Sequence, residues 1–369
     1  MESLSGGAHD GRVTAPSAPA RASLHRRFRL AVVVASVAAA IAGSVLLAEH
    51  RSSEKASAPT SHALPAGGKV VRRIRVGGGP LTVGEPLAVG EGAVWAVNAA
   101  GGRLMRIDPA RNAIVARIKV GVPAGVAAGD GGVWLANQSY NTVTRVDPAT
   151  HKRTTIRVGP SPEGIAVSPG AVWVANAGSL ASPGGPTVSR IDPATNRVVA
   201  TIRVGPHGDC CAEYTNLVAS RHAVWVALPN GNSIVHIDPA TNRVVKTVPV
   251  GFQPCGFLAA DATDVWVTPA GCGGGNAPST VTNLVARVDS RTNKVTRLAD
   301  VDPTGIVAAF GTVWVATGAA NVDQIGPHSG RLVARLHVGG GLGQLGVGFG
   351  SVWVDDAELG RVLRIKPQH

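Results

Sequence analysis

Aromatic side chains are scarce in this chain of 369 residues, because phenylalanine, tryptophan and tyrosine together make up only 4%. The apolar bulk must therefore come mainly from valine, isoleucine, leucine and alanine, while 47 glycines and 25 prolines supply many turns. This composition suits many short strands better than long helices. A single all-β repeat domain can account for this length.

Cysteine is equally scarce, with four residues, none of them before Cys210. The absence of an earlier cysteine excludes a lipoprotein anchor at the N-terminus. No C-x-x-C pair and no matching histidine spacing accompanies the four cysteines, which argues against a zinc site. The sequence therefore predicts no metal, no cofactor and no catalytic residue.

Most of the basic residues are not massed in one run, although the formal net charge is +12. Seven of the 35 lysines and arginines precede Lys69, and the others are spread over every repeat. Scattered charge indicates a solvated outer rim rather than base recognition, so nucleic acid is not the expected partner. Such a rim would be attracted to anionic lipid or to acidic cell-wall polymer.

A long apolar run without charge spans residues 30–48, directly after a basic cluster that includes Arg26, Arg27 and Arg29. As a helix it would be about 28 Å long, which is enough to cross a bilayer core. The basic flank places the N-terminus in the cytoplasm. An alternative is a secreted protein, because residues 56–58 have the small-residue pattern of a signal-peptidase site.

These features predict four segments along the chain. Residues 1–29 form a disordered, basic, cytoplasmic segment and residues 30–48 a transmembrane signal anchor. Residues 49–68, rich in Ser, Pro, Ala and Gly, form a flexible linker. Residues 69–369 form an extracytoplasmic domain.

All seven tryptophans follow one local pattern, a small or short polar residue followed by Val-Trp, at spacings of 39, 39, 52, 41, 48 and 39 residues. A period near 40 with turn residues between the strands is typical of a four-stranded β-propeller blade. The sequence therefore predicts a seven-bladed β-propeller. Because one tryptophan recurs in each blade, we expect all seven to form core between blades: Trp95, Trp134, Trp173, Trp225, Trp266, Trp314 and Trp353.

The clearest repeat, residues 164–205, contains four strand-like segments, and the last two are joined by Asp-Pro-Ala-Thr-Asn. In such turns the aspartate bonds the turn amides and the final residue adopts a left-handed conformation. The turn aspartates are Asp108, Asp147, Asp192, Asp238 and Asp289. The final residues are Asn112, His151, Asn196, Asn242, Asn293 and Gly330.

The last repeat ends before its fourth strand, whereas residues 69–77 at the start of the domain align with the fourth strand of the third repeat. We expect this N-terminal strand to complete blade 7 and close the ring, so that no blade boundary stays open.

The repeat V-G-x-x-P-x-G-[IV]-A followed by V-W-V-A-N and T-V-x-R-I-D-P-A-T-N-R-V-V-A-T-I-x-V-G resembles the YVTN-type, YncE-like propeller family of bacterial exported and surface proteins. The resemblance covers residues 69–367 and implies the propeller fold. The family includes binding and surface proteins, and DNA binding has been suggested within it. Streptogramin lyases share the architecture and carry W-F-T-E where this chain has Trp173-Val174-Ala175-Asn176.

The longer tryptophan spacings reveal three insertions, at residues 177–186, 206–216 and 269–283. Two of them join the second to the third strand of a blade, and one joins the fourth strand to the next blade. These two kinds of connection emerge on the same face of a propeller, so we expect the insertions to lie together over blades 3 to 5.

The four cysteines fall in this same sector, and an even number in an exported domain favours disulfides of undetermined pairing. They are Cys210, Cys211, Cys255 and Cys272. The polar residues near them, together with one from blade 3, are candidates for ligand binding: Glu163, His207, Asp209, Glu213, Tyr214, Asn216 and Gln253. Ordinary solvated loop residues are the alternative interpretation. His222 and His236 occupy strand-like positions and are expected to be structural.

The leading functional hypothesis is a non-catalytic, membrane-anchored binding platform for an extracytoplasmic protein, glycan or small ligand. The first alternative is a metal-dependent enzyme similar to the streptogramin lyases, which would need histidine and carboxylates converging from several blades. The second is a nucleic-acid-binding propeller of the YncE-like kind, against which export and scattered charge argue.

Overall fold

The computed structural model describes residues 64–65, 67–77, 87–178, 185–206, 216–269 and 283–368. The chain separates into two units, Met1–His62 and Ala63–His369, and the described residues belong to the second unit. The predicted anchor helix, 30–48, lies outside them. No helix in the described part of the chain is long and apolar enough to span a bilayer.

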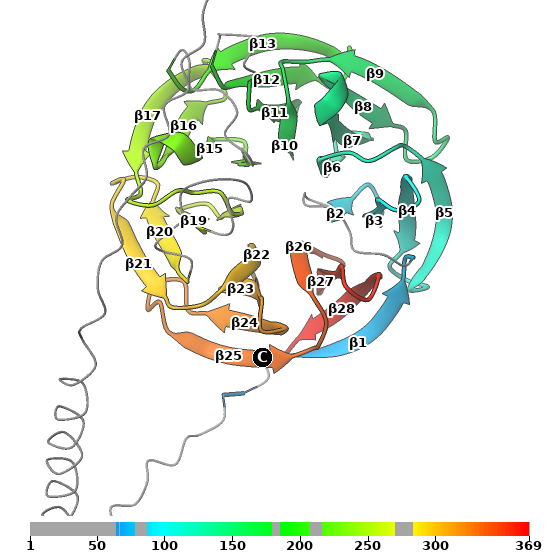
Figure 1. The fold of residues 1–369 in the computed structure, drawn as a ribbon, viewed down its shortest axis with the longest axis vertical. Coiled ribbons are helices and arrows are strands. Elements are labelled where there is room, and N and C mark those ends of the chain that lie inside the picture. The colour runs from blue at the N-terminus through cyan, green and yellow to red at the C-terminus, as the bar shows by residue number, and fades with distance from the viewer. Residues whose placement is uncertain are drawn as a thin grey trace, which may run out of the picture. The chain divides into compact units, whose positions relative to one another are not determined.

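The described residues form seven four-stranded antiparallel sheets that stand around a common axis, as Figure 1 shows. This confirms the predicted seven-bladed propeller. We number the blades 1 to 7 by their innermost strands, which are β2 (Leu87–Gly90), β6 (Gly125–Gly129), β10 (Pro162–Ser168), β14 (Leu217–Ala219), β18 (Leu258–Ala260), β22 (Pro303–Ala309) and β26 (Leu342–Gly348).

Each blade continues outward through a second, a third and a fourth strand. The second strands are β3 (Ala93–Asn98), β7 (Gly132–Asn137), β11 (Ala171–Asn176), β15 (Val224–Leu228), β19 (Asp264–Val267), β23 (Thr312–Thr317) and β27 (Ser351–Asp356). The third strands are β4 (Arg103–Asp108), β8 (Thr142–Val146), β12 (Thr187–Asp192), β16 (Ser233–Asp238), β20 (Val285–Asp289), β24 (Asn321–Ile325) and β28 (Arg361–Pro367).

The outermost strands are β5 (Ala113–Lys119), β9 (Arg153–Arg157), β13 (Arg197–Arg203), β17 (Arg243–Pro249), β21 (Val295–Ala299), β25 (Leu332–His337) and β1 (Gly68–Arg75). Two short 3-10 helices, η1 (Gln138–Tyr140) and η2 (Pro229–Gly231), follow the second strands of blades 2 and 4.

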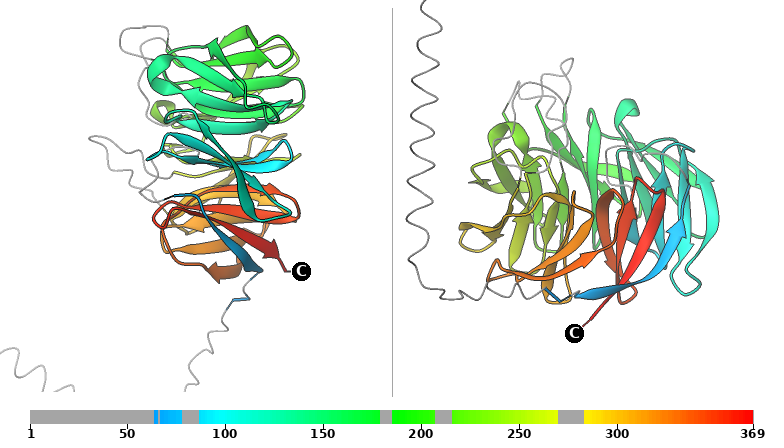
Figure 2. Two further views of the ribbon diagram at one scale, coloured as in Figure 1. Left: turned by 90° about the vertical axis from the view of Figure 1, so that its right-hand side faces the viewer. Right: turned by 60° about the horizontal axis from the view of Figure 1, so that its bottom comes forward.

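Strand β1 from the start of the domain closes blade 7, as the sequence predicted. It pairs antiparallel with β28, from Gly68 opposite Pro367 to Arg75 opposite Arg361. The blue strand therefore lies beside the red one in Figure 2. The strand is shifted by one or two residues from the predicted segment 69–77, because Gly68 already pairs and Val76 no longer does.

The core lies between the blades, where the seven tryptophans are at most 2% exposed. Trp95, for example, packs with Val126 and Val133 of the next blade. The indole N–H of Trp95 donates to the Gly90 carbonyl at 3.1 Å, and the indole N–H of Trp353 donates to the Gly348 carbonyl in the same way. A fully buried tryptophan contributes several kcal/mol through its apolar area, so the prediction that these residues hold neighbouring blades together is confirmed.

The turns between third and fourth strands also match the prediction. Asp192 Oδ1 accepts the Ala194 amide at 2.9 Å, and its Oδ2 accepts the Thr195 hydroxyl at 2.9 Å. Backbone bonds of this kind lower the pKa of the aspartate, first of all the bond from Ala194. The six final residues all have a left-handed φ, between 52° at Asn112 and 66° at Gly330.

An interaction that the sequence analysis missed links these turns to the tryptophans. Arg190 of β12 lies over Trp173, with its guanidinium carbon 5.1 Å from the ring centroid. Its Nη1 reaches the turn of blade 4 and donates to the Pro239 carbonyl at 2.8 Å and to Asn242 Oδ1 at 2.7 Å. We call this arrangement the arginine clasp, because it stacks on one blade and binds the next.

The clasp recurs at two other blade boundaries among the described residues. Arg145 joins blade 2 to the Pro193 carbonyl and Asn196 of blade 3. Arg364 joins blade 7 to Asn112 of blade 1 and thereby supports the ring closure. Asparagine at the left-handed position therefore has two roles, since it tolerates the turn conformation and accepts the arginine.

The clasp is incomplete between blades 1 and 2. Arg106 stacks on Trp95 at 5.8 Å, but blade 2 has His151 in place of the accepting asparagine. Arg106 Nε and His151 Nε2 are both buried, and neither has a hydrogen-bond partner among the described residues. Two buried polar groups are thus left unsatisfied at one boundary, which costs stability.

Replacing His151 by asparagine should complete this clasp. We expect the His151→Asn variant to be more stable than the wild type by about 1 kcal/mol, because one charge-assisted bond is gained and the left-handed position suits asparagine. Denaturant unfolding of the full chain measures the difference. The reverse change at the intact clasp, Asn196→His, should lower stability. Equal unfolding midpoints for His151→Asn and Asn196→His would contradict the role of the clasp.

Candidate functional site

Four of the eleven residues predicted from the sequence lie within the described part of the chain: Glu163, Asn216, Gln253 and Cys255. Seven lie outside it, namely His207, Asp209, Cys210, Cys211, Glu213, Tyr214 and Cys272. Their participation in a site therefore stays a prediction.

The described candidates have identifiable contacts within the blades. Glu163 on β10 accepts a hydrogen bond from Gln138 Nε2 at 2.8 Å, so it belongs to the boundary between blades 2 and 3. Asn216 is 8% exposed, and its Oδ1 accepts the Leu217 amide at 2.7 Å. Its carbonyl accepts the Ala227 amide at 2.9 Å, so Asn216 fixes the start of β14 in blade 4.

Cys255 is buried, at 5% exposure, and is disulfide-bonded. Its backbone amide donates to the Gln253 carbonyl at 3.0 Å, and the next residue, Gly256, donates to Thr268. The second sulfur of the disulfide lies outside the described residues. Which cysteine pairs with Cys255 stays a prediction.

The described flanks of the insertions stand at the connections expected for them. The Val204 amide donates to the Pro186 carbonyl at 3.1 Å, which places the flanks of the first two insertions side by side in blade 3. Thr268, before the third insertion, donates its amide to the Phe257 carbonyl in blade 5. Connections of these two types leave an antiparallel blade at the same end, which we call the insertion end.

A cavity of about 760 Å³ follows the axis of the ring. Innermost strands of all seven blades form its wall, mainly through Val, Ala, Leu and Ile side chains such as Val89, Val167 and Val307. Its size is in the range of sites for small organic ligands, and most of the residues that line it have apolar side chains.

The wall becomes polar between blades 4 and 5, where His222 and His236 face the cavity together with Asp261. His222 lies in the turn after β14 rather than in a strand, so its predicted position was wrong. His236 replaces the arginine of the other clasps, and its ring stacks on Trp225 with centroids 4.5 Å apart and planes 15° apart. The shorter side chain makes no clasp to blade 5.

His236 also leaves a hydrogen-bonding atom unused. Its Nε2 is buried and has no partner among the described residues. Burial lowers the pKa of His236, although nearby Asp238 opposes this shift, so the imidazole is neutral at physiological pH. A neutral imidazole has one nitrogen that donates and one that accepts a hydrogen bond.

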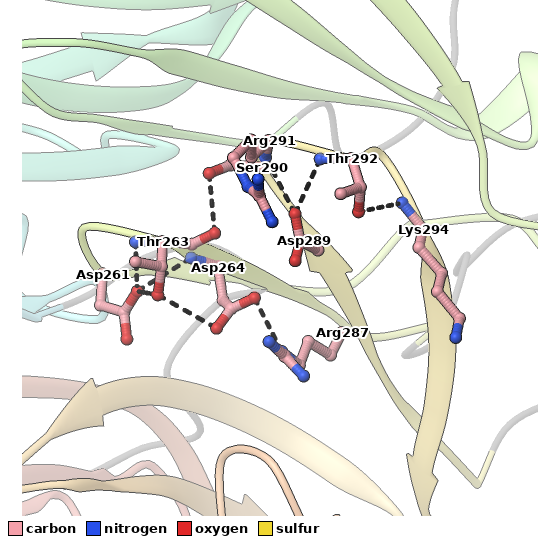
Figure 3. A network of polar contacts seen from close by, with 9 residues as sticks. All are labelled: Asp261, Thr263, Asp264, Arg287, Asp289, Ser290, Arg291, Thr292 and Lys294. Carbon is pink, nitrogen blue, oxygen red and sulfur yellow. Dashed lines mark hydrogen bonds and ion pairs between the residues drawn. The ribbon is translucent and has the colours of Figure 1, made fainter.

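A dense polar network holds the neighbouring turns of blade 5, as Figure 3 shows. Asp264, 1% exposed, forms an ion pair with Arg287 at 2.7 Å, while the Ser290 hydroxyl donates to the Thr263 carbonyl at 2.7 Å. Asp261 Oδ1 accepts the amides of Thr263 and Asp264. These bonds connect the two turns of the blade and keep this edge of the cavity rigid.

A second polar group lies at the insertion end, in blade 7. Asp355 is 2% exposed and occupies the position held by Val97, Ala136 and Ala175 in blades 1 to 3. Burial, and to a lesser extent the adjacent Asp356, raises the pKa of Asp355 to about 7. Asp356 itself is paired with Arg361, at 2.6 Å.

Two unsatisfied side chains accompany Asp355 at this end. Gln344 of blade 7 lines the cavity, and its Oε1 has no partner among the described residues. Thr304 Oγ1 of blade 6 is also buried without a hydrogen-bond partner among them. Gly305 and Gly343 bring the two innermost strands together here, since a side chain on Gly305 would strike the Gly343 carbonyl. The sequence signal for this cluster was V-W-V-D-D in place of V-W-V-A-N.

The cavity thus has an apolar middle and polar groups toward both ends, which suits binding. No group of three or more His, Cys, Asp or Glu residues that could hold a metal ion occurs within the described ranges. Asp355 can exchange a proton near neutral pH, and His236 can donate or accept a hydrogen bond.

Comparisons with known proteins support the fold. No family model and no curated protein matches the chain. Among solved structures, it is similar to a Kuenenia stuttgartiensis hydrazine synthase chain, with 16% identity, a TM-score of 0.62, and coverage of 79% of this chain and 98% of that one. A streptogramin B lyase gives 14% identity and a TM-score of 0.62 over 80% and 97% of the two chains.

The Neurospora crassa Pan2 WD40 domain is also similar, with 11% identity and a TM-score of 0.64 over 84% of this chain and 98% of that one. Three proteins with such different names share the architecture, and at these identities the likeness shows the fold alone. The chain is therefore a seven-bladed β-propeller, and its resemblance to the YVTN-type repeats carries no further assignment.

Asp355 should make the stability of the propeller dependent on pH. Below about pH 4 the carboxyl is protonated in both the folded and the unfolded state. Between about pH 4 and pH 7 only the unfolded state loses the proton, so the free energy of unfolding falls as pH rises. Asp355→Asn removes this loss, and we expect it to raise stability by roughly 2–4 kcal/mol at pH 8 and little at pH 4.

Denaturant unfolding of both proteins at the two pH values provides the measurement. Asp355→Ala, which restores the residue of blades 2 and 3, should behave in the same way. A gain in stability that is equal at pH 4 and pH 8 would show that Asp355 does not titrate as described.

Proposed function

We propose that this protein is an extracytoplasmic ligand-binding propeller, tethered to the membrane by residues 30–48, and that its ligand occupies the central cavity. The cavity carries this proposal, because about 760 Å³ of space is lined by aliphatic side chains from all seven blades, with the polar side chains of His222, His236 and Gln344 toward its ends. A few polar groups in a mainly aliphatic lining can fix the orientation of a bound ligand.

The lining indicates the chemistry of the ligand. Aliphatic side chains from seven blades favour a hydrophobic body, while the polar side chains of His222, His236 and Gln344 favour hydrogen-bonding groups on the ligand. A small amphipathic molecule combines both. Because all seven innermost strands are fixed in paired sheets, the cavity is preformed and binding requires little ordering of its wall.

The insertion loops complete the proposal. They begin and end at the insertion end of blades 3 to 5, and we propose that the disulfide of Cys255 braces them over the cavity entrance. A cross-link removes part of the entropy that a long loop would lose on binding. The candidates His207, Asp209, Glu213 and Tyr214 would then contact the ligand from these loops.

Blocking the cavity should abolish binding of an amphipathic probe. We expect 1-anilinonaphthalene-8-sulfonate to bind the full chain saturably and with enhanced fluorescence. Ala219→Phe places a large ring in the cavity and should weaken this binding at least tenfold. His236→Phe keeps the stacking on Trp225 but removes the nitrogen, so a loss of about threefold to tenfold is expected.

The matched control is Val199→Phe, since Val199 lies on the outer strand β13 and is 56% exposed. It should bind the probe as the wild type does. Equal affinities for the cavity variant and the control, with both proteins folded by circular dichroism, would move the site out of the cavity.

The membrane tether is tested by fractionation. We expect the full chain to stay in the membrane fraction after an alkaline wash, and a variant without residues 30–48 to lose membrane attachment. Protease added outside the cytoplasm should reach the propeller. A shortened wild-type protein found only in the soluble fraction would instead support secretion after signal cleavage.

A further inference from the structure

A second cavity, of about 450 Å³, lies between blades 1 and 2, away from the central one. All ten described residues that line it are uncharged. Seven of them carry amide or hydroxyl groups: Asn137, Gln138, Ser139, Tyr140, Thr142, Thr144 and Thr155. The opposite wall is the backbone turn 120–122 after blade 1, and Tyr140 stands at the edge with 80% of its surface exposed.

The strand register of blade 2 places the polar side chains on one face. Asn137 pairs with Thr142, and Leu135 pairs with Thr144. Thr144 in turn pairs with Thr155 on β9. Leu135 packs against Trp95 of blade 1, so this face of the blade is directed toward blade 1. Three adjacent strands thus present a continuous polar surface beyond the apolar core.

The hydrogen bonds leave the hydroxyl protons available. Asn137 Nδ2 donates to Thr142 Oγ1 at 3.1 Å and to Thr144 Oγ1 at 2.9 Å. Each threonine oxygen is therefore an acceptor in the free protein, and its O–H can donate to a ligand. Gln138 is oriented by its bond to Glu163, at 2.8 Å. The pocket offers several neutral donors and acceptors in fixed positions.

Blade 3 contains the same arrangement in a closed form. Asn176 Nδ2 donates to Thr187 Oγ1 at 3.1 Å and to Ser189 Oγ at 3.0 Å. Gly159 of the preceding turn covers these groups, and its amide donates to Ser189 Oγ at 3.4 Å. Asn176 is consequently 0% exposed.

The covering turn is displaced in blade 2. Gly121 follows blade 1 in the same way that Gly159 follows blade 2. Gly121 has a φ of 84°, and a Cβ atom added to it would meet no heavy atom within 4 Å. Asn137, Thr142 and Thr144 are accordingly half-buried rather than buried. The same polar network is therefore structural in blade 3 and accessible in blade 2.

We propose that this pocket, formed by Tyr140 and the Asn137–Thr142–Thr144 network, binds a neutral saccharide. Sugars combine C–H faces, which stack on an aromatic ring, with neighbouring hydroxyl groups that donate and accept hydrogen bonds. Tyr140 supplies the ring at the pocket edge, and the amides and hydroxyls supply matching partners. An uncharged lining gives no counter-charge to an ionic ligand. The pocket is a separate site from the central cavity.

The test uses the full chain with N,N′-diacetylchitobiose, cellobiose and maltose as probes, and glucuronic acid as a charged comparison. Titration calorimetry and ligand-detected NMR measure binding. We expect at least one neutral disaccharide to bind and glucuronic acid to bind more weakly. Tyr140→Ala should weaken binding at least tenfold, and Thr144→Val, which is nearly isosteric, about fivefold to tenfold.

The matched control is Ser189→Ala in blade 3, which removes the hydroxyl that corresponds to that of Thr144 from the covered network and should leave sugar binding unchanged. Ala219→Phe in the central cavity should also leave it unchanged, which separates this site from the proposed function. The proposal is overturned if no neutral probe binds, if the blade 2 variants bind as the wild type does, if glucuronic acid is preferred, or if Ala219→Phe abolishes binding.

Discussion

The boundary between consecutive blades depends on a buried tryptophan, and at three boundaries an arginine extends that contact into the next blade. Trp173 fills the space between blades 3 and 4, and Arg190 covers its ring while bonding to the turn of blade 4. An antiparallel sheet alone would hold only the strands within a blade. The tryptophan and the arginine convert seven sheets into one ring, because they act across the boundaries that no strand pairing spans.

Several polar groups lie where the repeat pattern changes. Between blades 4 and 5 the arginine is replaced by His236, and the central cavity extends to the imidazole and to Trp225. In blade 7 a buried carboxyl, Asp355, stands where other blades have an apolar side chain. Between blades 1 and 2, where His151 leaves Arg106 unsatisfied, the neighbouring turn also leaves a polar pocket open. Regular repeats thus provide the framework, and departures from the repeat provide groups that can bind.

The repeat pattern was sufficient to predict the fold, because one tryptophan per blade, Gly-marked turns and a missing last strand all reflect the geometry of a closed ring. It also predicted the left-handed positions, since Asn, His and Gly tolerate that conformation. The clasp escaped prediction because its partners lie about 50 residues apart, as with Arg190 and Asn242. The pocket of blade 2 could not be predicted either: equivalent asparagine and hydroxyl side chains are covered in blade 3 and open in blade 2, and the path of one turn makes the difference.

The closing strand has a consequence for the order in which the protein can form. β1 is among the first parts of the propeller to be synthesised, yet its partner β28 is the last. Blade 7 cannot assemble until β28 has been synthesised, and Arg364 cannot reach blade 1 before then. The earlier blades can form one after another behind the ribosome, but the ring stays an open arc with two unpaired edges until β28 pairs with β1. The last strand of the propeller to be made is therefore the one that turns the arc into a ring.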